Sequence, residues 1–235
     1  MLKQINKGFL TGNILKLIAM LLMTVDHVCK QYEITNMWLL ALGRLAMPIF
    51  AYMIAEGCKY TKNRIKYFSV MFVTGVLCQV VYYFTLKSLY QCILITFSMS
   101  LLLIYAVDLI KRKKLLGGTL TALMIGITYV ACNILPKHLE HLEFEIDYGF
   151  FGVLLPVLIF LGKKKLQKLI MLAIGLVLMA YALGEPLQWY SLSVVPLIFF
   201  YNGKRGKVNL KYLFYVYYPL HLGAIYLLYE GGVGK

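Results

Sequence analysis

An aspartate and a histidine, Asp26 and His27, stand side by side within the first long apolar stretch of the sequence. Ionisable side chains at membrane depth are costly and are kept mainly where they line a cavity or do chemistry. A neutral imidazole is a general base near pH 7, so His27 is our candidate catalytic base. Adjacent residues point about 100° apart on a helix, so we expect Asp26 to meet a neighbouring helix.

Lys16 precedes His27 by eleven residues. Eleven residues are close to three helical turns, or about 16 Å, so the two side chains share one face. A cation at the inner end of this face and an imidazole deeper in the membrane suit an elongated anionic ligand that enters from the cytoplasm. The alternative for Lys16 is a side chain that extends to the membrane surface from a helix end.

Arg44, in the second apolar stretch, is the expected partner of Asp26, because a buried arginine needs a counter-ion. We therefore group Arg44 with Asp26 and His27 as candidate catalytic residues. Glu56 follows Arg44 by twelve residues and is a substrate-site candidate. Its alternative role is an ion pair with Lys59 or Arg64.

His221 follows Pro219 in the last apolar stretch. Proline loosens or kinks a helix, which can open a cavity wall beside the histidine, although packing alone would explain the residue equally well. His221 is therefore a second substrate-site candidate. No metal is expected, because neither His27 nor any cysteine has ligands at metal-binding spacing. We interpret the five cysteines as buried free thiols.

The composition predicts an all-α, polytopic membrane protein. Hydrophobic residues make up 61% of the 235 residues and charged residues 14%, far from the balance of a soluble domain. We expect no cleavable signal peptide and a single domain over 1–235, with no internal repeat. About nine transmembrane helices are predicted, over 14–32, 37–57, 65–86, 91–110, 115–135, 147–162, 167–184, 187–201 and 210–229.

The connections between these stretches alternate in charge. Basic residues gather in every second connection, and most acidic residues lie in the others. The basic groups are Lys3 and Lys7; Lys59, Lys62, Arg64 and Lys66; Lys111, Arg112, Lys113 and Lys114; Lys163, Lys164, Lys165 and Lys168; Lys204, Arg205, Lys207 and Lys211. This alternation predicts a cytoplasmic N-terminus and an external C-terminus. It also explains the net charge of +14 without a nucleic-acid partner.

Several segments resemble the TraX family. They read "LKLIAMLLMTVDHV", "LGRLAMPIFAYMIAEGCKYTKNRIKYF", "LITFSMSLLLIY", "DYGFFGVLLPVLIFL" and "KYLFYVYYPLHL", in this order along nearly the whole chain. The family is named for a conjugative-plasmid protein that acetylates the N-terminus of pilin. More distantly, TraX proteins resemble the transmembrane acyltransferase superfamily, in which an arginine lies eleven positions before a histidine in the first span.

The resemblance implies an acetyltransferase in a bacterial inner (plasma) membrane. "KLIAMLLMTVDH" places Lys16 and His27 at the superfamily's spacing, with lysine instead of arginine. By this resemblance Lys16 contacts the phosphates of acetyl-CoA, together with Arg64, Lys66 and Lys211, and His27 is the catalytic histidine. The acceptor would be a peptide or pilin amine, a lipid headgroup or a glycan hydroxyl on the outer side.

Two other functions agree with the same residues. A small transporter or flippase would also carry charges near the midplane and a proline in a helix. A scaffold of a secretion or surface assembly would need neither His27 nor acyl-CoA. The shared face of Lys16 and His27 favours the acetyltransferase.

Overall fold

The computed structural model describes residues 8–208 and 210–232, and within them it contains helices and loops but no β-strand. Thr85, Leu86 and Lys211 lie in helices, but their side chains are outside the description. The all-helical prediction is confirmed. Among the described residues, five helical stretches are long and apolar enough to cross a membrane, over Gly12–Gln31, Met37–Tyr60, Arg64–Phe84, Lys114–His138 and Lys165–Leu183.

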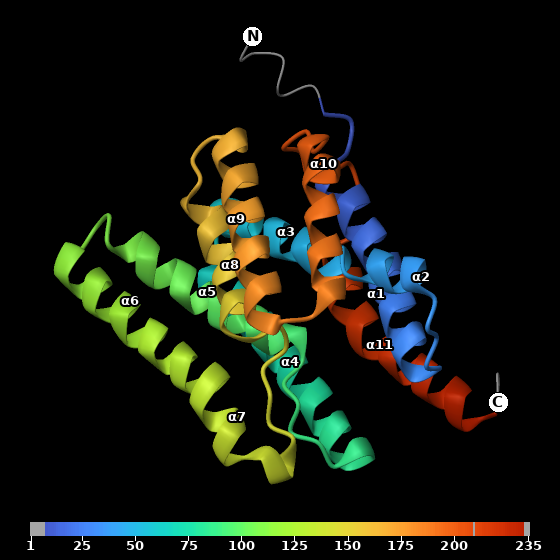
Figure 1. The fold of residues 1–235 in the computed structure, drawn as a ribbon. Helices are drawn as coiled ribbons and strands as arrows, with labels where there is room; N and C mark the ends of the chain where they lie inside the picture. The colour runs from blue at the N-terminus through green and yellow to red at the C-terminus, as the bar shows by residue number, and fades with distance from the viewer. Residues whose placement is uncertain (1–7, 209, 233–235) are drawn as a thin grey trace. The chain divides into compact units, whose positions relative to one another are not determined.

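Each predicted apolar stretch coincides with helical structure (Figure 1). The α-helices are α1 (Gly12–Gln31), α2 (Met37–Gly43), α3 (Ala46–Tyr60), α4 (Arg64–Leu86), α5 (Ile93–Leu109), α6 (Lys114–Tyr129), α7 (Leu135–His138), α8 (Gly149–Leu161), α9 (Lys165–Leu183), α10 (Val194–Phe199) and α11 (Lys211–Glu230). A π-helical segment, η2 (Val130–Ile134), joins α6 to α7, and the 3₁₀ helices are η3 (Glu140–Leu142) and η4 (Pro186–Ser193).

The second predicted stretch is interrupted. It forms α2 and α3 with a break at Arg44 and Leu45. Pro48 lies in the first turn of α3, where it has no N–H to donate and its ring would clash with the carbonyl of residue 44 in a continuous helix. Arg44 itself keeps the helical backbone of α2, and its N–H donates to Leu40 O at 3.3 Å.

The chain folds into two compact units, and the boundaries fall inside α3 and α9. Unit 1 comprises Met1–Met53 and Leu172–Lys235, and unit 2 comprises Ile54–Met171. In unit 1, α1 packs against α2 and α11, and α2 packs against η4 (Figure 1). The prediction of one functional domain concerns both units together and stays a prediction.

The start of α1 is fixed by the loop that precedes α11. The N–H groups of Gly12 and Asn13 donate to the carbonyls of Lys204 and Arg205, at 2.8 and 2.9 Å. The Asn13 side chain donates to Val208 O at 2.6 Å. These bonds satisfy donors that a helix start leaves free and hold the first turn of α1 in unit 1.

Helix α5 is the central helix of unit 2, in contact with α4, α6 and α8. Its buried residues include Thr96, Ser98 and Ser100 as well as apolar side chains, so burial extends around the helix. The Ser100 hydroxyl donates to Val153 O at 2.7 Å and thereby joins α5 to α8. A helix that is apolar all round is expected in the core of its unit.

Candidate active site

Two histidines meet between α1 and α11. The ring centroids of His27 and His221 lie 5.0 Å apart, with the rings nearly perpendicular. His27 is partly buried and His221 is buried. The structure therefore places the substrate-site candidate His221 next to the candidate base His27.

Both imidazoles are held in the same tautomer. His27 Nδ1 lies 2.7 Å from Met23 O, and His221 Nδ1 lies 3.0 Å from Tyr217 O. A carbonyl oxygen only accepts, so each Nδ1 carries the proton and each Nε2 keeps a lone pair. Within the described residues, His221 Nε2 is buried without a hydrogen-bond partner. In the neutral form of both rings, Nε2 is therefore the nitrogen that can accept a proton.

A tyrosine and a threonine support His221. The Tyr217 ring stacks on the His221 ring with a centroid distance of 5.1 Å and an interplanar angle of 8°. Thr24 Oγ1 donates to Met20 O at 3.0 Å, so the hydroxyl of Tyr217, 2.6 Å away, donates to Thr24 Oγ1. This bond joins α1 to α11 beside the imidazoles.

Lys16 lies on the same interface as His27. Its ammonium is 4.9 Å from the centroid of the Phe214 ring on α11. Lys16 near the start of α1 contacts Phe214 near the start of α11, and His27 further along α1 contacts His221 further along α11. The two helices therefore pack in parallel. The predicted shared face of Lys16 and His27 agrees with this arrangement.

The charge near Lys16 suits an anion. Arg205, in the loop that packs on the start of α1, is close enough to Lys16 for the two cations to repel each other. Among the described residues, no carboxylate forms an ion pair with Lys16. Lys16 is therefore available to an anionic group such as a phosphate.

In the described part of the chain, Asp26 and Arg44 form ion pairs with residues other than those predicted. Asp26 Oδ2 lies 2.8 Å from Lys30 Nζ, one turn further along α1, and Arg44 Nη2 lies 3.6 Å from Glu185 Oε2. Asp26 does meet α2, but at Gly43, where an added Cβ would come within 2.7 Å of the Asp26 Cβ. The packing of α2 on α1 thus places a glycine against Asp26.

Glu56 belongs to unit 2, where it is buried and forms an ion pair with Lys168 of α9. The alternative partners from the sequence are engaged elsewhere. Lys59 Nζ donates to Gly162 O at 3.1 Å, and Arg64 Nη2 lies 2.5 Å from Asp108 Oδ2. Glu56 is therefore neutralised in the core of unit 2.

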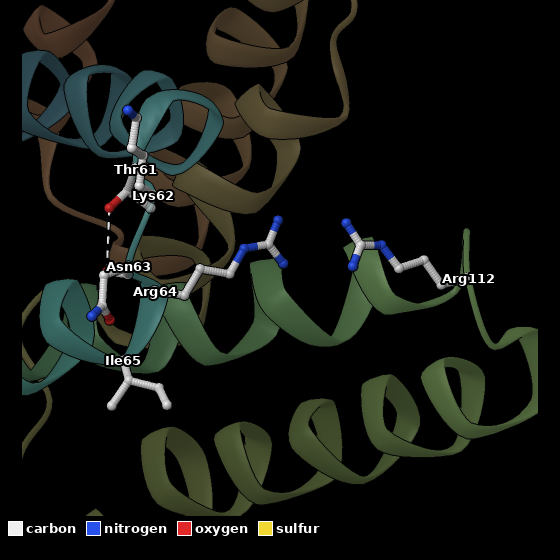
Figure 2. A pocket seen from close by; sticks show the side chains of 6 residues that line it. All are labelled: Thr61, Lys62, Asn63, Arg64, Ile65 and Arg112. Atoms are coloured by element: carbon white, nitrogen blue, oxygen red, sulfur yellow. Dashed lines mark hydrogen bonds between the residues drawn. The ribbon is translucent and has the colours of Figure 1, made fainter.

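The predicted phosphate-binding residue Arg64 lines a basic pocket of unit 2. The pocket has a volume of about 530 Å³ and is lined by Thr61, Lys62, Asn63, Arg64, Ile65 and Arg112. Figure 2 shows the Arg64 and Arg112 side chains pointing toward one another. Asp108 is shared by Arg64 and Lys111, at 2.5 and 2.7 Å, so cations outnumber acids here.

The two other predicted phosphate ligands have different positions. Lys66 is exposed in the first turn of α4, where its backbone N–H donates to the Asn63 side chain, and it is not among the residues that line the pocket. Lys211 begins α11, and its side chain lies outside the described part of the chain.

Comparison with known proteins supports the resemblance noted in the sequence. The sequence model described as "TraX protein" matches residues 11–229. The chain belongs to the TraX family. The TraX-family chain is also 23% identical, over 239 residues, to a protein of Dichelobacter nodosus called "Probable fimbrial assembly protein FimC, serogroup H1". The match covers 90% of this chain and 92% of that relative. No solved structure matches the chain.

The sequence reasoning about this TraX protein missed Thr24 and Tyr217. The signal was available, because Tyr217 precedes His221 by four residues and Thr24 precedes His27 by three, spacings that place side chains on one helix face. Lys62 and Arg112 were used only as basic residues that indicate the membrane topology. Their place in one pocket depends on the turn before α4 and on the end of α5, which sequence spacing does not reveal.

Proposed function

We propose that this TraX-family protein is a membrane-embedded acetyltransferase. It takes the acetyl group from cytoplasmic acetyl-CoA and transfers it to an acceptor on the extracytoplasmic side of a bacterial plasma membrane. The acceptor is the N-terminal amine of a pilin-like peptide or a hydroxyl group. His27 is the general base.

The observation that carries this proposal is the state of His27. Its Nδ1–H is bound to Met23 O, so Nε2 is left as a base, and the ring lies on the same helix interface as Lys16. A base that accepts a proton from an attacking amine or hydroxyl contributes about 10²–10⁴-fold to a rate. Lys16 adds a cation, without a carboxylate partner among the described residues, for the phosphates of the donor.

The topology of the proposal has nine spans with the N-terminus in the cytoplasm. The alternation of basic and acidic connections supports this orientation. In a chain with nine crossings, the first and last helices run in the same direction. The parallel packing of α1 and α11 agrees with that requirement.

Each unit offers its own cationic side chains as a separate candidate site for the donor phosphates. Unit 1 offers Lys16, with Lys211 at the start of α11, and unit 2 offers Arg64 and Lys66. Arg64 already has Asp108 as a partner, so Lys16 is the position from which we expect the larger loss of donor affinity.

The acceptor is proposed from the family and from the relative. Pilin acetylation is the activity for which TraX is named, and the Dichelobacter nodosus relative carries the name of a fimbrial assembly protein. Both observations agree with an acceptor that is a surface-filament subunit with a free N-terminus. The acceptor amine or hydroxyl would approach His27 from the outer side.

Acetyl-CoA binding to the purified protein in detergent, measured by calorimetry, tests the proposal. We expect saturable binding to the wild type, weakened about tenfold or more in Lys16→Ala and retained in His27→Asn. Asparagine retains a donor for Met23 O but no base. Transfer of a labelled acetyl group should fall about 100-fold or more in His27→Asn.

The controls are His138→Asn and Lys137→Ala. His138 makes the same Nδ1 contact to a carbonyl one turn earlier, 2.9 Å from Ile134 O, but it is exposed. Lys137 is an exposed lysine beside it. Both variants should bind acetyl-CoA and transfer acetyl groups like the wild type. No binding to the wild type at millimolar acetyl-CoA would overturn the acetyltransferase and favour a transporter.

A further inference from the structure

His221 is a buried base that the proposed function does not yet use. Only 6% of its surface is exposed, and its Nε2 has no hydrogen-bond partner among the described residues. A buried polar atom without a hydrogen-bond partner is destabilising and rare in folded proteins, so such an atom needs an explanation. Nε2 carries the lone pair of an imidazole that lies against His27.

The arrangement holds this imidazole in place from two sides. Tyr217 stacks flat on the ring, and its hydroxyl donates to Thr24 on α1. Tyr217 O also accepts the Nδ1–H of His221. The ring plane, the tautomer and the distance to α1 are therefore set by the same tyrosine and its threonine partner.

Acetylation of an amine needs two proton acceptors in sequence. At pH 7 most of an α-amino group is ammonium, because its pKa is about 7.7–8.0. The ammonium must lose one proton before its nitrogen can attack, and the nitrogen loses a second proton after attack. A hydroxyl acceptor has a single proton to lose, so one base is sufficient for it.

We propose that His221 accepts the first proton from the acceptor ammonium and that His27 accepts the second. This inference rests on the proposed function. The neutral amine then attacks the thioester carbonyl, the C–N bond forms, and His27 Nε2 takes the second proton from nitrogen. The C–S bond breaks, and the coenzyme thiolate takes that proton from His27. The products are the amide, the free thiol and the proton held by His221, which is released to water.

The division between the two histidines follows from their positions. His27 shares the α1 face with Lys16, the proposed contact of the donor, so it can return a proton to the donor sulfur. His221 lies on the other helix, α11, so it is assigned the proton of the acceptor ammonium. The other titratable groups around the pair are Asp26 and Lys30 on α1 and Tyr217 and Tyr218 on α11. Helix α2, which also packs on α1, has no titratable side chain.

The test compares His221→Asn with His27→Asn at two pH values. The acceptor is a pool of short synthetic peptides that differ in their N-terminal residue, and acetylation is measured by mass spectrometry. At about pH 7, roughly one tenth of the peptide amine is neutral without a base, so His221→Asn should lose up to about tenfold in rate. At about pH 9.5 the peptide amine is already neutral, and the variant should return to within about threefold of the wild type. His27→Asn should stay about 100-fold slower at both pH values.

A second acceptor distinguishes a role of His221 in removing a proton from a role in packing. Peptides that end in an aromatic amine are uncharged at neutral pH, so wild type and His221→Asn should acetylate them at the same rate. Acetyl-CoA binding and the midpoint of thermal unfolding should be unchanged in His221→Asn, as in the His138→Asn control. Tyr217→Phe should keep the stacked ring and lose only a few-fold in rate.

An equal loss in His221→Asn at both pH values and with both amines would overturn this role, because it would mean that His221 only holds the site together. The proposed function fails by a different result. If the wild type acetylates none of the peptides, the amine acetyltransferase is overturned, and the role of His221 falls with it.

Discussion

Buried ionisable groups have different surroundings in the two units. In unit 2, Glu56 is paired with Lys168, and Asp108 is paired with both Arg64 and Lys111. In unit 1, His27 and His221 have backbone carbonyls at Nδ1 and each other as neighbours, with no carboxylate bonded to either among the described residues. A buried charge without a partner is destabilising, so the carboxylates of unit 2 keep cationic partners, whereas an imidazole nitrogen with a free lone pair can accept a proton. This difference supports the chemical role proposed for the imidazoles of unit 1.

The Glu56–Lys168 pair offers the largest effect on stability. Lys168→Met leaves the buried Glu56 carboxylate without its partner and should lower the free energy of unfolding by about 3–5 kcal/mol. The measurement is thermal or denaturant unfolding in detergent. The double variant Glu56→Met/Lys168→Met should recover most of the loss, because two apolar side chains replace the pair.

The matched control is Lys111→Met. Lys111 is 70% exposed, and Asp108 keeps Arg64 as a partner, so the loss should stay within about 1 kcal/mol. If Lys168→Met were as mild as this control, the Glu56–Lys168 pair would not be a stability element of unit 2.

Gly43 tests the packing of α2 on Asp26. In Gly43→Ala the new methyl group would lie 2.7 Å from Asp26 Cβ and 2.8 Å from Asp26 Oδ1. Helix α1 must shift to relieve this overlap, so we expect a loss of about 1–3 kcal/mol in unfolding free energy. Acetyl transfer should fall as well, because His27 follows Asp26. Gly118→Ala on α6 is the control, because no atom lies within 4 Å of the added Cβ and alanine favours a helix. If Gly43→Ala lost no more stability than this control, α2 would be able to adjust to the added methyl group.

Tyr90 tests a loop of unit 2, and its expected effect on stability depends on pH. Its hydroxyl donates to Asp147 Oδ1 at 2.5 Å, and burial, followed by the charge of Asp147, raises the pKa of Tyr90. Tyr90→Phe should cost about 1.5–3 kcal/mol at about pH 8. The folded state holds this proton more tightly than the unfolded state does. Wild-type stability should therefore decline above about pH 10, and the difference from the variant should narrow there.

The unfolding midpoints of wild type and Tyr90→Phe, followed from about pH 8 to pH 11, measure this effect. Parallel curves would mean that the hydrogen bond to Asp147 does not couple folding to the proton of Tyr90.

The helices were predictable because hydrophobic stretches of this length have few alternatives. The first stretch, 14–32, became α1 over Gly12–Gln31, and the spacing of Lys16 and His27 correctly placed both residues on one face. The second stretch, 37–57, also lies within one candidate membrane span, Met37–Tyr60, which contains a two-residue turn at Arg44 and Leu45. The sequence did not reveal which residue of this stretch lies against Asp26: it is Gly43, whereas Arg44 lies near Glu185.

Contacts between distant segments were the part that spacing could not supply. Glu56 and Lys168 lie 112 positions apart, and no local periodicity relates them. The contact between His27 and His221 could not be predicted for the same reason. It depends on α1 and α11 being neighbours in the fold, which the residue pattern within each helix does not reveal. Residue type did help, since two histidines in apolar stretches are costly unless each finds a polar environment.

Helices α1 and α11 have a consequence for how the protein is made. Thr24 and Tyr217, which join these helices, are separated by 193 positions. At about 5–20 residues per second, the ribosome adds Tyr217 roughly 10–40 s after Thr24. During that interval the nascent chain carries His27 without Tyr217 or His221. Under the proposed function, a chain truncated before α11 would lack the His27–His221 pair, so acetyl transfer would require synthesis of the last helix.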